Sequence, residues 1–399
     1  MSKADKDINQ YVNSITRKCV HCGFCLATCP TYLLLGEEMN SPRGRVYLIK
    51  NIINGEKITK PIVNALDNCL LCRSCESTCP SGVNYHQLLD FARLRITTTY
   101  RRGLFEKFYR YLVVNFLTNK LLLKSAVNLA VLFKPVLPTR LKKILPEKVQ
   151  AKPCQAKIMA KEKVLLLANC VQPTIAPNIN HKTVSVLNKL NVEVALAEQC
   201  CAAIEQHLGL QQIALTRIKA NIDLWYQKLT QEGYSYLVSN VSGCGLMIQD
   251  YPGLLKNSQE YYQKAKLVSS KSLDLAQYLS SFNLSLFNTK SNKTLSLHLP
   301  CSLQHGQNDK HSIFNILEQL GFTVGFAPDS HLCCGSAGTY SIFQAKIASQ
   351  LAEEKIAKLV LNKPDIIVSA NIGCISHLQK HTDIKVCHWI ELLDANISQ

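Results

Sequence analysis

The sequence predicts an α + α/β protein, with an α-helical N-terminal domain, a basic helical linker and two repeated α/β modules. A cysteine-rich run occurs twice within residues 1–90, positive charge is concentrated in residues 91–163, and a second pattern of cysteines repeats across residues 164–399. We therefore place the domains at residues 1–100, 101–163, 164–290 and 291–399. A chain of 399 residues is long enough for two or three domains of ordinary size.

The two N-terminal runs are CVHCGFCLATCP at 19–30 and CLLCRSCESTCP at 69–80, and both have the spacing C-x2-C-x2-C-x3-C-P. Bacterial two-cluster ferredoxins use this spacing, and the fourth cysteine of each run binds the other run's cluster. A structural zinc site would instead use separate CxxC knuckles. We predict an α-helical ferredoxin domain with two 4Fe-4S clusters. The expected ligand sets are Cys19, Cys22, Cys25 with Cys79, and Cys69, Cys72, Cys75 with Cys29.

Between these runs, residues 45–53 have apolar side chains at helical spacing, and Gly55 can end that helix. Arg43 and Arg45 lie in the preceding turn, where they could offset the negative charge of a cluster or simply be solvated. The chain has 18 cysteines, and its polar first residues lack an apolar leader segment. That combination indicates metal ligands, not disulfides, and a reducing cytoplasmic compartment.

Residues 91–163 hold 17 Lys and Arg but only 3 Asp and Glu, and so carry most of the net charge of +17. Such a basic block favours lipid headgroups or an acidic subunit as partner, and no nucleic-acid motif accompanies it. Residues 104–133 are predicted to form an amphipathic helix whose apolar runs are too short to span a membrane. It could lie on a membrane surface or pack on the protein's own domains. The four prolines that follow indicate an extended linker up to about residue 163.

Residues 164–399 alternate predicted strands with helices, which indicates α/β layers. The expected strands are 164–168, 192–197, 236–239, 295–299, 323–327 and 366–369, and the expected helices are 184–190, 213–229, 313–320 and 343–360. A cysteine, a Cys-Cys pair and a Gly-Cys follow successive strands in both copies, at offsets of 130 to 133 residues. The carboxyl ends of parallel strands converge on one crevice, so four cysteines can meet around a metal there. The two candidate sets are Cys170, Cys200, Cys201 with Cys244, and Cys301, Cys333, Cys334 with Cys374.

The chain resembles the iron-sulfur subunits of bacterial glycolate oxidase (glycolate dehydrogenase) through CVHCGFCLATCPTY, SPRGR, CRSCESTCPSGV, QPTIAPN, SGCG, DSHLCCGSAGTY, ANIGC and HWIE. This resemblance implies an electron-transfer subunit that holds no catalytic residue of its own. It would take electrons from FAD-containing subunits that oxidise glycolate to glyoxylate, and pass them to membrane quinone. The expected assembly is a hetero-oligomer at the cytoplasmic face of the inner membrane. The implied fold is a ferredoxin domain followed by two cysteine-rich modules, as in heterodisulfide reductases.

The sequence departs from the wider module pattern, in which CCG is followed by CxxC. Ala202 replaces the glycine of the first copy, and Val241 and Asn371 stand where the first cysteine of CxxC would be. A five-cysteine site that reduces disulfides is therefore disfavoured, but a heterodisulfide-reductase-like catalytic subunit remains an alternative. So does the corresponding subunit of a lactate or glycerol-3-phosphate dehydrogenase. No GxGxxG or flavin-binding loop stands out, so neither an NAD nor a flavin site is expected in this chain.

Several further residues stand near the cysteine loops or outside the repeat. His305, His331 and His377 lie close to the cysteines in sequence and could bond a cluster or a quinone, although loop histidines are more often solvated. Cys154 and Cys387 have no counterpart in the repeat and are expected to be incidental.

Overall fold

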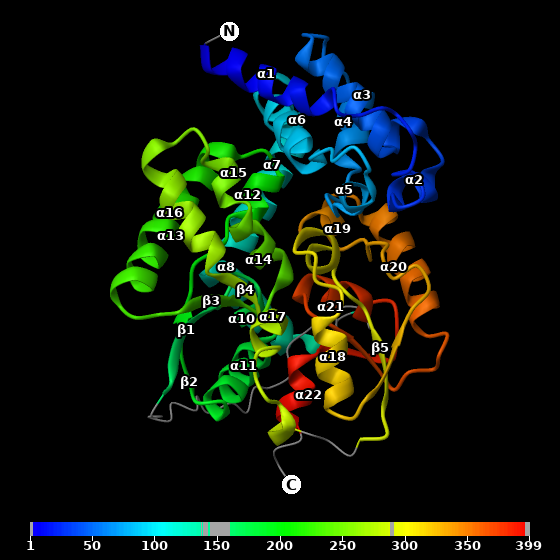
Figure 1. The fold of residues 1–399 in the computed structure, drawn as a ribbon. Helices are drawn as coiled ribbons and strands as arrows, with labels where there is room; N and C mark the ends of the chain where they lie inside the picture. The colour runs from blue at the N-terminus through cyan, green and yellow to red at the C-terminus, as the bar shows by residue number, and fades with distance from the viewer. Residues whose placement is uncertain (1–2, 137, 139–142, 144–159, 288–290, 396–399) are drawn as a thin grey trace.

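The computed structural model describes residues 3–136, 138, 143, 160–287 and 291–395, and it confirms the predicted α + α/β architecture. A helical N-terminal part is followed by two four-stranded parallel sheets. Figure 1 shows the N-terminal helices in blue and cyan at the top of the view, with the first sheet region in green and the second in yellow to red below them. Most of the Pro-rich linker, including Cys154, lies outside the described residues.

The N-terminal helices surround an apolar core that includes Ile49, Leu66 and Leu88, each fully buried. The cysteine runs lie in loops and, for Cys75, in the short helix α5. The helices are α1 (Lys3–Thr16), α2 (Pro30–Leu35), α3 (Pro42–Ile53), α4 (Lys60–Asp67), α5 (Ser74–Thr78) and α6 (Tyr85–Thr99), with the 3-10 turn η1 (Glu38–Asn40) before α3.

Helix α3 begins one turn earlier than the apolar pattern predicted. Ser41 is its N-cap, with a side-chain oxygen that accepts a hydrogen bond from the Gly44 amide at 3.0 Å, and Pro42 occupies the first helical position. Both choices satisfy or remove amide groups that a helix start leaves unpaired. The helix therefore starts before the basic pair, so Arg43 and Arg45 are held on a rigid element.

The single amphipathic helix predicted for residues 104–133 is wrong. The chain forms two helices, α7 (Leu104–Thr118) and α8 (Lys120–Leu132), which contact one another. The break falls at Asn119, whose extended backbone ends α7 and whose side chain accepts hydrogen bonds from the Leu121 and Leu122 amides. Asparagine is a strong N-cap, so it starts a new helix where the apolar pattern alone would continue the old one. In the described part of the chain, no helix is long and apolar enough to cross a membrane.

The first sheet has the strand order β2-β1-β3-β4, with all strands parallel. Its strands are β1 (Glu162–Leu167), β2 (Val192–Ala197), β3 (Tyr236–Ser239) and β4 (Ser272–Asp274). Helices cover both faces, and so residues 164–167 of the central strand are fully buried. The helices are α10 (Gln172–Ile175), α11 (Pro177–Lys189), α12 (Ala203–His207), α13 (Gln211–Gln231), α14 (Ser242–Gln249), α15 (Tyr251–Leu254), α16 (Gln259–Ser270) and α17 (Leu275–Leu279), followed by the 3-10 turn η3 (Ser285–Phe287).

The second sheet repeats this topology in the order β6-β5-β7-β8, again with all strands parallel. Its strands are β5 (Thr294–Leu297), β6 (Thr323–Phe326), β7 (Ile366–Ser369) and β8 (Lys385–His388). The helices are α18 (Ser312–Gln319), α19 (Tyr340–Phe343), α20 (Ala345–Leu359), α21 (Ile372–Gln379) and α22 (Ile390–Ala395), with a π-helical turn η4 (Ser302–Gly306) after β5.

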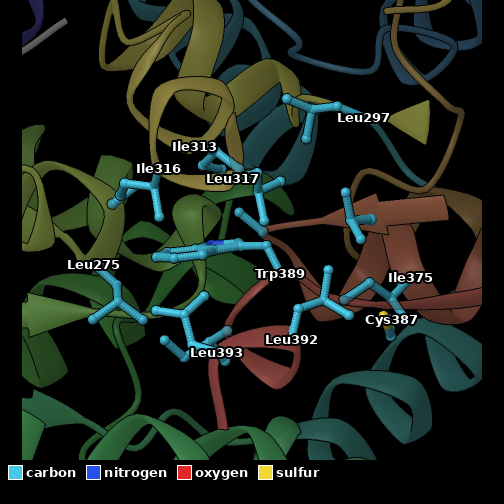
Figure 2. Packing of buried hydrophobic residues seen from close by; sticks show 14 of the residues in the cluster. Leu275, Leu297, Ile313, Ile316, Leu317, Ile375, Cys387, Trp389, Leu392 and Leu393 are labelled. Carbon is cyan, nitrogen blue, oxygen red and sulfur yellow. The ribbon is translucent and has the colours of Figure 1, made fainter. Parts of the chain in front are cut away.

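One apolar core joins the two sheet regions. Trp389 is fully buried at its centre, and Figure 2 shows its ring between side chains of α18 on one side and Leu392 and Leu393 on the other. Leu275, from the first sheet region, packs into the same cluster. Because the core is continuous, the two modules are held in one fixed relation, which matters for the distance between their cysteine sets.

Candidate functional site

The four cysteines of the first module meet at the carboxyl ends of adjacent strands. Cys170 follows β1, Cys200 and Cys201 follow β2, and Cys244 lies in α14, directly after β3. Their side chains form a continuous chain of contacts, from Cys170 to Cys200, on to Cys201 and then to Cys244. Strand β1 lies at the centre of the sheet, with β2 on one side and β3 on the other, so the chain connections run in opposite directions from it. In open α/β sheets, ligands bind at the carboxyl end of the strands at such a switch point.

The second module assembles its set in the same way. Cys301 Sγ lies 3.8 Å from Cys333 Sγ, and Cys334 links Cys333 to Cys374. Contact with Cys333, together with burial, raises the pKa of Cys301 well above its usual range. Thiols this close cannot all ionise without a cation among them, and a bound metal ion supplies that charge.

A left-handed turn follows each Cys-Cys pair. In the second module the turn residue is Gly335, with φ 88°, and a Cβ there would lie 2.7 Å from the Ala348 carbonyl oxygen. In the first module Ala202 keeps the same kind of turn, with φ 64°. The alanine carries a conformational cost that glycine would avoid. The lost glycine therefore does not change the shape of the first cysteine loop.

A histidine that the sequence analysis did not single out belongs to the second set. A ring nitrogen of His298 and the Sγ atoms of Cys334 and Cys374 all lie within 4.8 Å of one another. The His298 side chain is buried at the end of β5, and burial lowers its pKa to about 3, so the imidazole is neutral. In the sequence, the one feature that could have indicated this ligand is a single histidine directly after the strand TLSL, three residues before Cys301.

The N-terminal cysteines combine across the two runs. Cys29 of the first run and Cys69, Cys72 and Cys75 of the second line one small cavity, together with Arg45. Cys25 neighbours Cys19 and Cys29, and burial raises the pKa of Cys25 to about 11. Cys19 and Cys79 both pack against the helical core, whereas Cys22 is exposed.

Arg45 is the cation of this cavity. It is 1% exposed, and its guanidinium donates to the Ala65 carbonyl at 2.7 Å, to Thr31 Oγ1 at 3.0 Å and to Cys29 Sγ at 3.8 Å. Burial alone would lower the pKa of Arg45, because it disfavours the charged form. Nearby thiols outweigh this effect and raise the pKa, and Cys69 makes the largest of these contributions. No carboxylate pairs with it among the described residues, and the nearest ionisable side chain that it contacts is the Cys29 thiol. Arg43, by contrast, forms an exposed ion pair with Glu38 at 2.6 Å.

Each C-terminal set also has a cation beside it. The guanidinium of Arg217 contacts the Cys200 thiol and pairs with Glu205 at 2.9 Å. Lys355 is 3% exposed, and although burial lowers its pKa, the thiols of Cys334 and Cys333 oppose that shift. Cations next to thiols suit iron-sulfur clusters, which carry net negative charge through their thiolate ligands.

The N-terminal and second-module sets face each other across the domain interface. Cys72 and Cys301 pack against the same apolar cluster, and after burial the Cys301 thiol makes the largest contribution to raising the pKa of Cys72. Leu70 and Tyr340 pack with Cys333 around this contact, and the Tyr340 hydroxyl donates to the Asn68 carbonyl at 3.1 Å. The side chains that join the domains therefore include the candidate ligands themselves.

Of the three histidines that lie near the cysteines in sequence, His305 and His377 bond other groups through their rings. The ring of His305 bridges Ser77 Oγ at 2.8 Å and the His331 carbonyl at 2.8 Å, so it joins the domains. His377 bonds the Ala348 carbonyl at 3.0 Å. Cys387 is buried among apolar side chains of the shared core, as an incidental thiol would be.

Comparison with known proteins agrees with this arrangement. The family described as 4Fe-4S dicluster domain matches residues 15–83, and the cysteine-rich domain matches twice, at residues 164–249 and 295–379. The glycolate oxidase iron-sulfur subunit of Escherichia coli is 41% identical over 390 residues, which are 97% of this chain and 95% of that protein. The probable glycolate oxidase iron-sulfur subunit of Bacillus subtilis is 27% identical over 90% of this chain and 88% of that protein. Lactate utilization protein A of Halalkalibacterium halodurans is 25% identical over 58% of this chain and 96% of its own length.

Proposed function

Because the chain belongs to the family of glycolate oxidase iron-sulfur subunits, we propose that it relays electrons from a flavin-containing partner, which oxidises glycolate to glyoxylate, to membrane quinone. The observation that carries this proposal is that Cys72 and Cys301 pack against one apolar cluster, which brings two thiol sets together across a domain interface. The two C-terminal modules then extend the path that begins in the ferredoxin domain.

We propose these ligands for the clusters. One 4Fe-4S cluster is held by Cys19, Cys22, Cys25 and Cys79, and the other by Cys69, Cys72, Cys75 and Cys29. The C-terminal sets, Cys170, Cys200, Cys201 with Cys244 and Cys301, Cys333, Cys334 with Cys374, hold further clusters. When bound, such clusters supply one-electron oxidation and reduction. The protein's own contribution is to hold the sulfurs, to exclude water from them, and to place Arg45, Arg217 and Lys355 beside them.

Reconstitution tests the function. The purified chain alone should oxidise no glycolate, and mixing it with the flavin subunits should restore glycolate-dependent reduction of a quinone analogue. Flavin subunits that reach full quinone reduction without this chain would contradict the proposal. The same mixture tested with lactate addresses the second candidate, since relatives named lactate utilization protein A match 58% of the chain.

A cavity between α7 and the first module suits a quinone. Its volume is about 300 Å³, with an apolar wall that includes Val114 and Ile213 and a polar end that includes Glu205 and Arg217. Arg217 also contacts Cys200, so the cavity begins one side chain from the first-module thiols. Reduction of a quinone consumes two electrons and two protons. Burial raises the pKa of Glu205, and the guanidinium of Arg217 pairs with its carboxylate at 2.9 Å.

The helices beside this cavity expose an apolar surface, which we call the hairpin face. Its members are large apolar side chains of α7, α8 and the residue after α8, and together they form a basic, amphipathic surface of the kind that lies in a membrane interface. They are Leu104, Phe105, Phe108, Tyr109, Tyr111, Leu112, Phe116, Leu121, Leu122, Leu129, Leu132 and Phe133. We propose that this face rests on anionic lipid, so that a quinone can reach the cavity from the bilayer.

Charge placed on the hairpin face should release the protein from lipid. Phe105 is 86% exposed and Leu121 is 77% exposed, so replacing both with glutamate should leave the fold intact. Lost apolar contact and repulsion from anionic headgroups should weaken binding at least about tenfold. Flotation with vesicles that contain phosphatidylglycerol measures this.

A matched control replaces Leu286 and Leu361, which are 67% and 62% exposed outside the hairpin face, with glutamate. That variant should bind vesicles like the unmodified protein. Equal loss in both double variants would mean that overall charge, not the hairpin face, sets the binding. Unchanged binding in the Phe105 and Leu121 variant would contradict the proposal that this face rests on lipid.

A further inference from the structure

We propose that His298 is a fifth ligand of the second-module cluster, bound through an imidazole nitrogen alongside Cys301, Cys333, Cys334 and Cys374. This inference rests on the proposed clusters of the C-terminal modules. It makes the second site a mixed thiolate and imidazole centre, where the sequence pattern suggested four sulfurs alone.

The position of the side chain carries the inference. A ring nitrogen of His298 lies within 4.8 Å of the Sγ atoms of both Cys334 and Cys374. The residue is 3% exposed, and its Nε2 has no hydrogen-bond partner within the described residues. Buried polar atoms are usually paired, so a histidine that keeps an unpaired ring nitrogen and whose imidazole lies beside two thiols is a candidate metal ligand.

Other buried histidines of the same module show what an ordinary core histidine does. His388 is fully buried, its Nε2 bonds the Asn240 carbonyl at 3.0 Å, and its Nδ1 accepts from the Ile390 amide at 3.2 Å. His377 bonds a carbonyl as well. The fold therefore satisfies these rings with backbone groups, whereas Nε2 of His298 is left without one.

The backbone places His298 where a ligand is needed. It directly follows β5, at the strand end that also leads into Cys301. Asn371 lies at the start of α21, where the wider cysteine pattern would supply one more thiolate to this site, and its side chain instead caps the helix by accepting from the Gly373 amide. An imidazole at the carboxyl end of the neighbouring parallel strand can supply the missing donor.

The two modules would then differ in a way that suits electron flow. The counterpart of His298 in the first module is Leu167, which is fully buried and cannot bind a metal. In Rieske proteins, imidazole ligands in place of thiolates raise the reduction potential of the cluster. A neutral imidazole as fifth donor likewise leaves the second-module centre less negative than the fifth thiolate of the wider cysteine pattern would. The second-module cluster should thus have a different reduction potential from the first-module cluster, although the two modules share the same cysteine pattern.

Pulsed electron paramagnetic resonance of the full chain tests the inference without relying on a variant. The protein is purified anaerobically with its flavin partners, either unlabelled or with ¹⁵N-histidine, and reduced stepwise with dithionite. A strongly coupled histidine nitrogen that changes with the label is expected. A complete set of spectra without such a coupling would overturn the inference.

Variants identify the residue. His298→Gln should abolish the nitrogen coupling and lower iron by up to about four atoms per chain, whereas His388→Gln should keep both. A coupling that survives in His298→Gln would overturn the inference, as would zinc in place of iron in the second module. An iron content of about eight in the unmodified protein would also overturn it. In that last case glycolate-dependent electron transfer through the N-terminal clusters could still be measured, so the two proposals fail separately.

Discussion

Replacing Cys333 and Cys334 together with alanine is expected to remove about four irons and four acid-labile sulfides per chain, and replacing Cys200 and Cys201 to remove the same number. The reason is geometric, because each pair lies in the middle of its chain of sulfur contacts and no other side chain could bridge the gap. Metal analysis of anaerobically purified protein measures the loss. Quinone reduction by the reconstituted complex should fall to background in the Cys333 and Cys334 variant, since that set adjoins Cys72.

The matched control is Cys387→Ala. Cys387 belongs to the same module and is 3% exposed, but it packs in the apolar core around Trp389 (Figure 2). Its replacement should leave the iron content unchanged and cost about 1 kcal/mol of stability. Should the unmodified protein hold only about eight irons, the C-terminal sets would be thiols without clusters, and electron flow would have to end in the ferredoxin domain.

The repeated cysteine spacings could be read from the sequence because they depend on counting and not on where elements begin or end, and the ligand sets assigned to them remain predictions. The strands 192–197, 236–239 and 366–369 were also predicted at their observed limits, since each is an apolar run with clear borders. Strands β4 and β8 were missed. Both lie at sheet edges, are only three and four residues long, and contain polar residues such as Ser272 and Lys385. The break at Asn119 was missed because apolar spacing continues across it.

What the sequence could not provide is the pairing of distant groups. Nothing in the chain order indicates that Cys72 and Cys301 pack against the same apolar cluster. Nor does it indicate that Arg45, and not Arg43, is the buried cation. The first arises from the packing of the helical domain on the second module, and the second from the packing of α3 against α4. His298 was missed for a related reason. A single histidine after an apolar strand is interpreted as a core residue until the fold places Cys334 and Cys374 beside it.

Replacing Arg45 with methionine is expected to make the potential of the cluster held by Cys69, Cys72, Cys75 and Cys29 more negative. The guanidinium lies 3.8 Å from Cys29 Sγ, and it favours the reduced state because reduction adds negative charge. At an effective dielectric constant of about 20, loss of one charge at this distance corresponds to about 2–4 kcal/mol, or on the order of 100 mV for a one-electron couple. A potentiometric titration followed by electron paramagnetic resonance measures the shift.

Arg43→Met is the control, because it removes the same charge two residues away on the same helix. Arg43 is paired with Glu38 at the surface, where solvent screens both charges, so the cluster potential should hardly change. Equal shifts in the two variants would mean that Arg45 acts through net charge alone. A large shift in Arg45→Met only would mean that the buried cation sets the potential of this cluster. The cluster could then accept electrons from a flavin more readily than its four thiolates alone would allow, and burial of an arginine without a carboxylate partner would have its physical explanation.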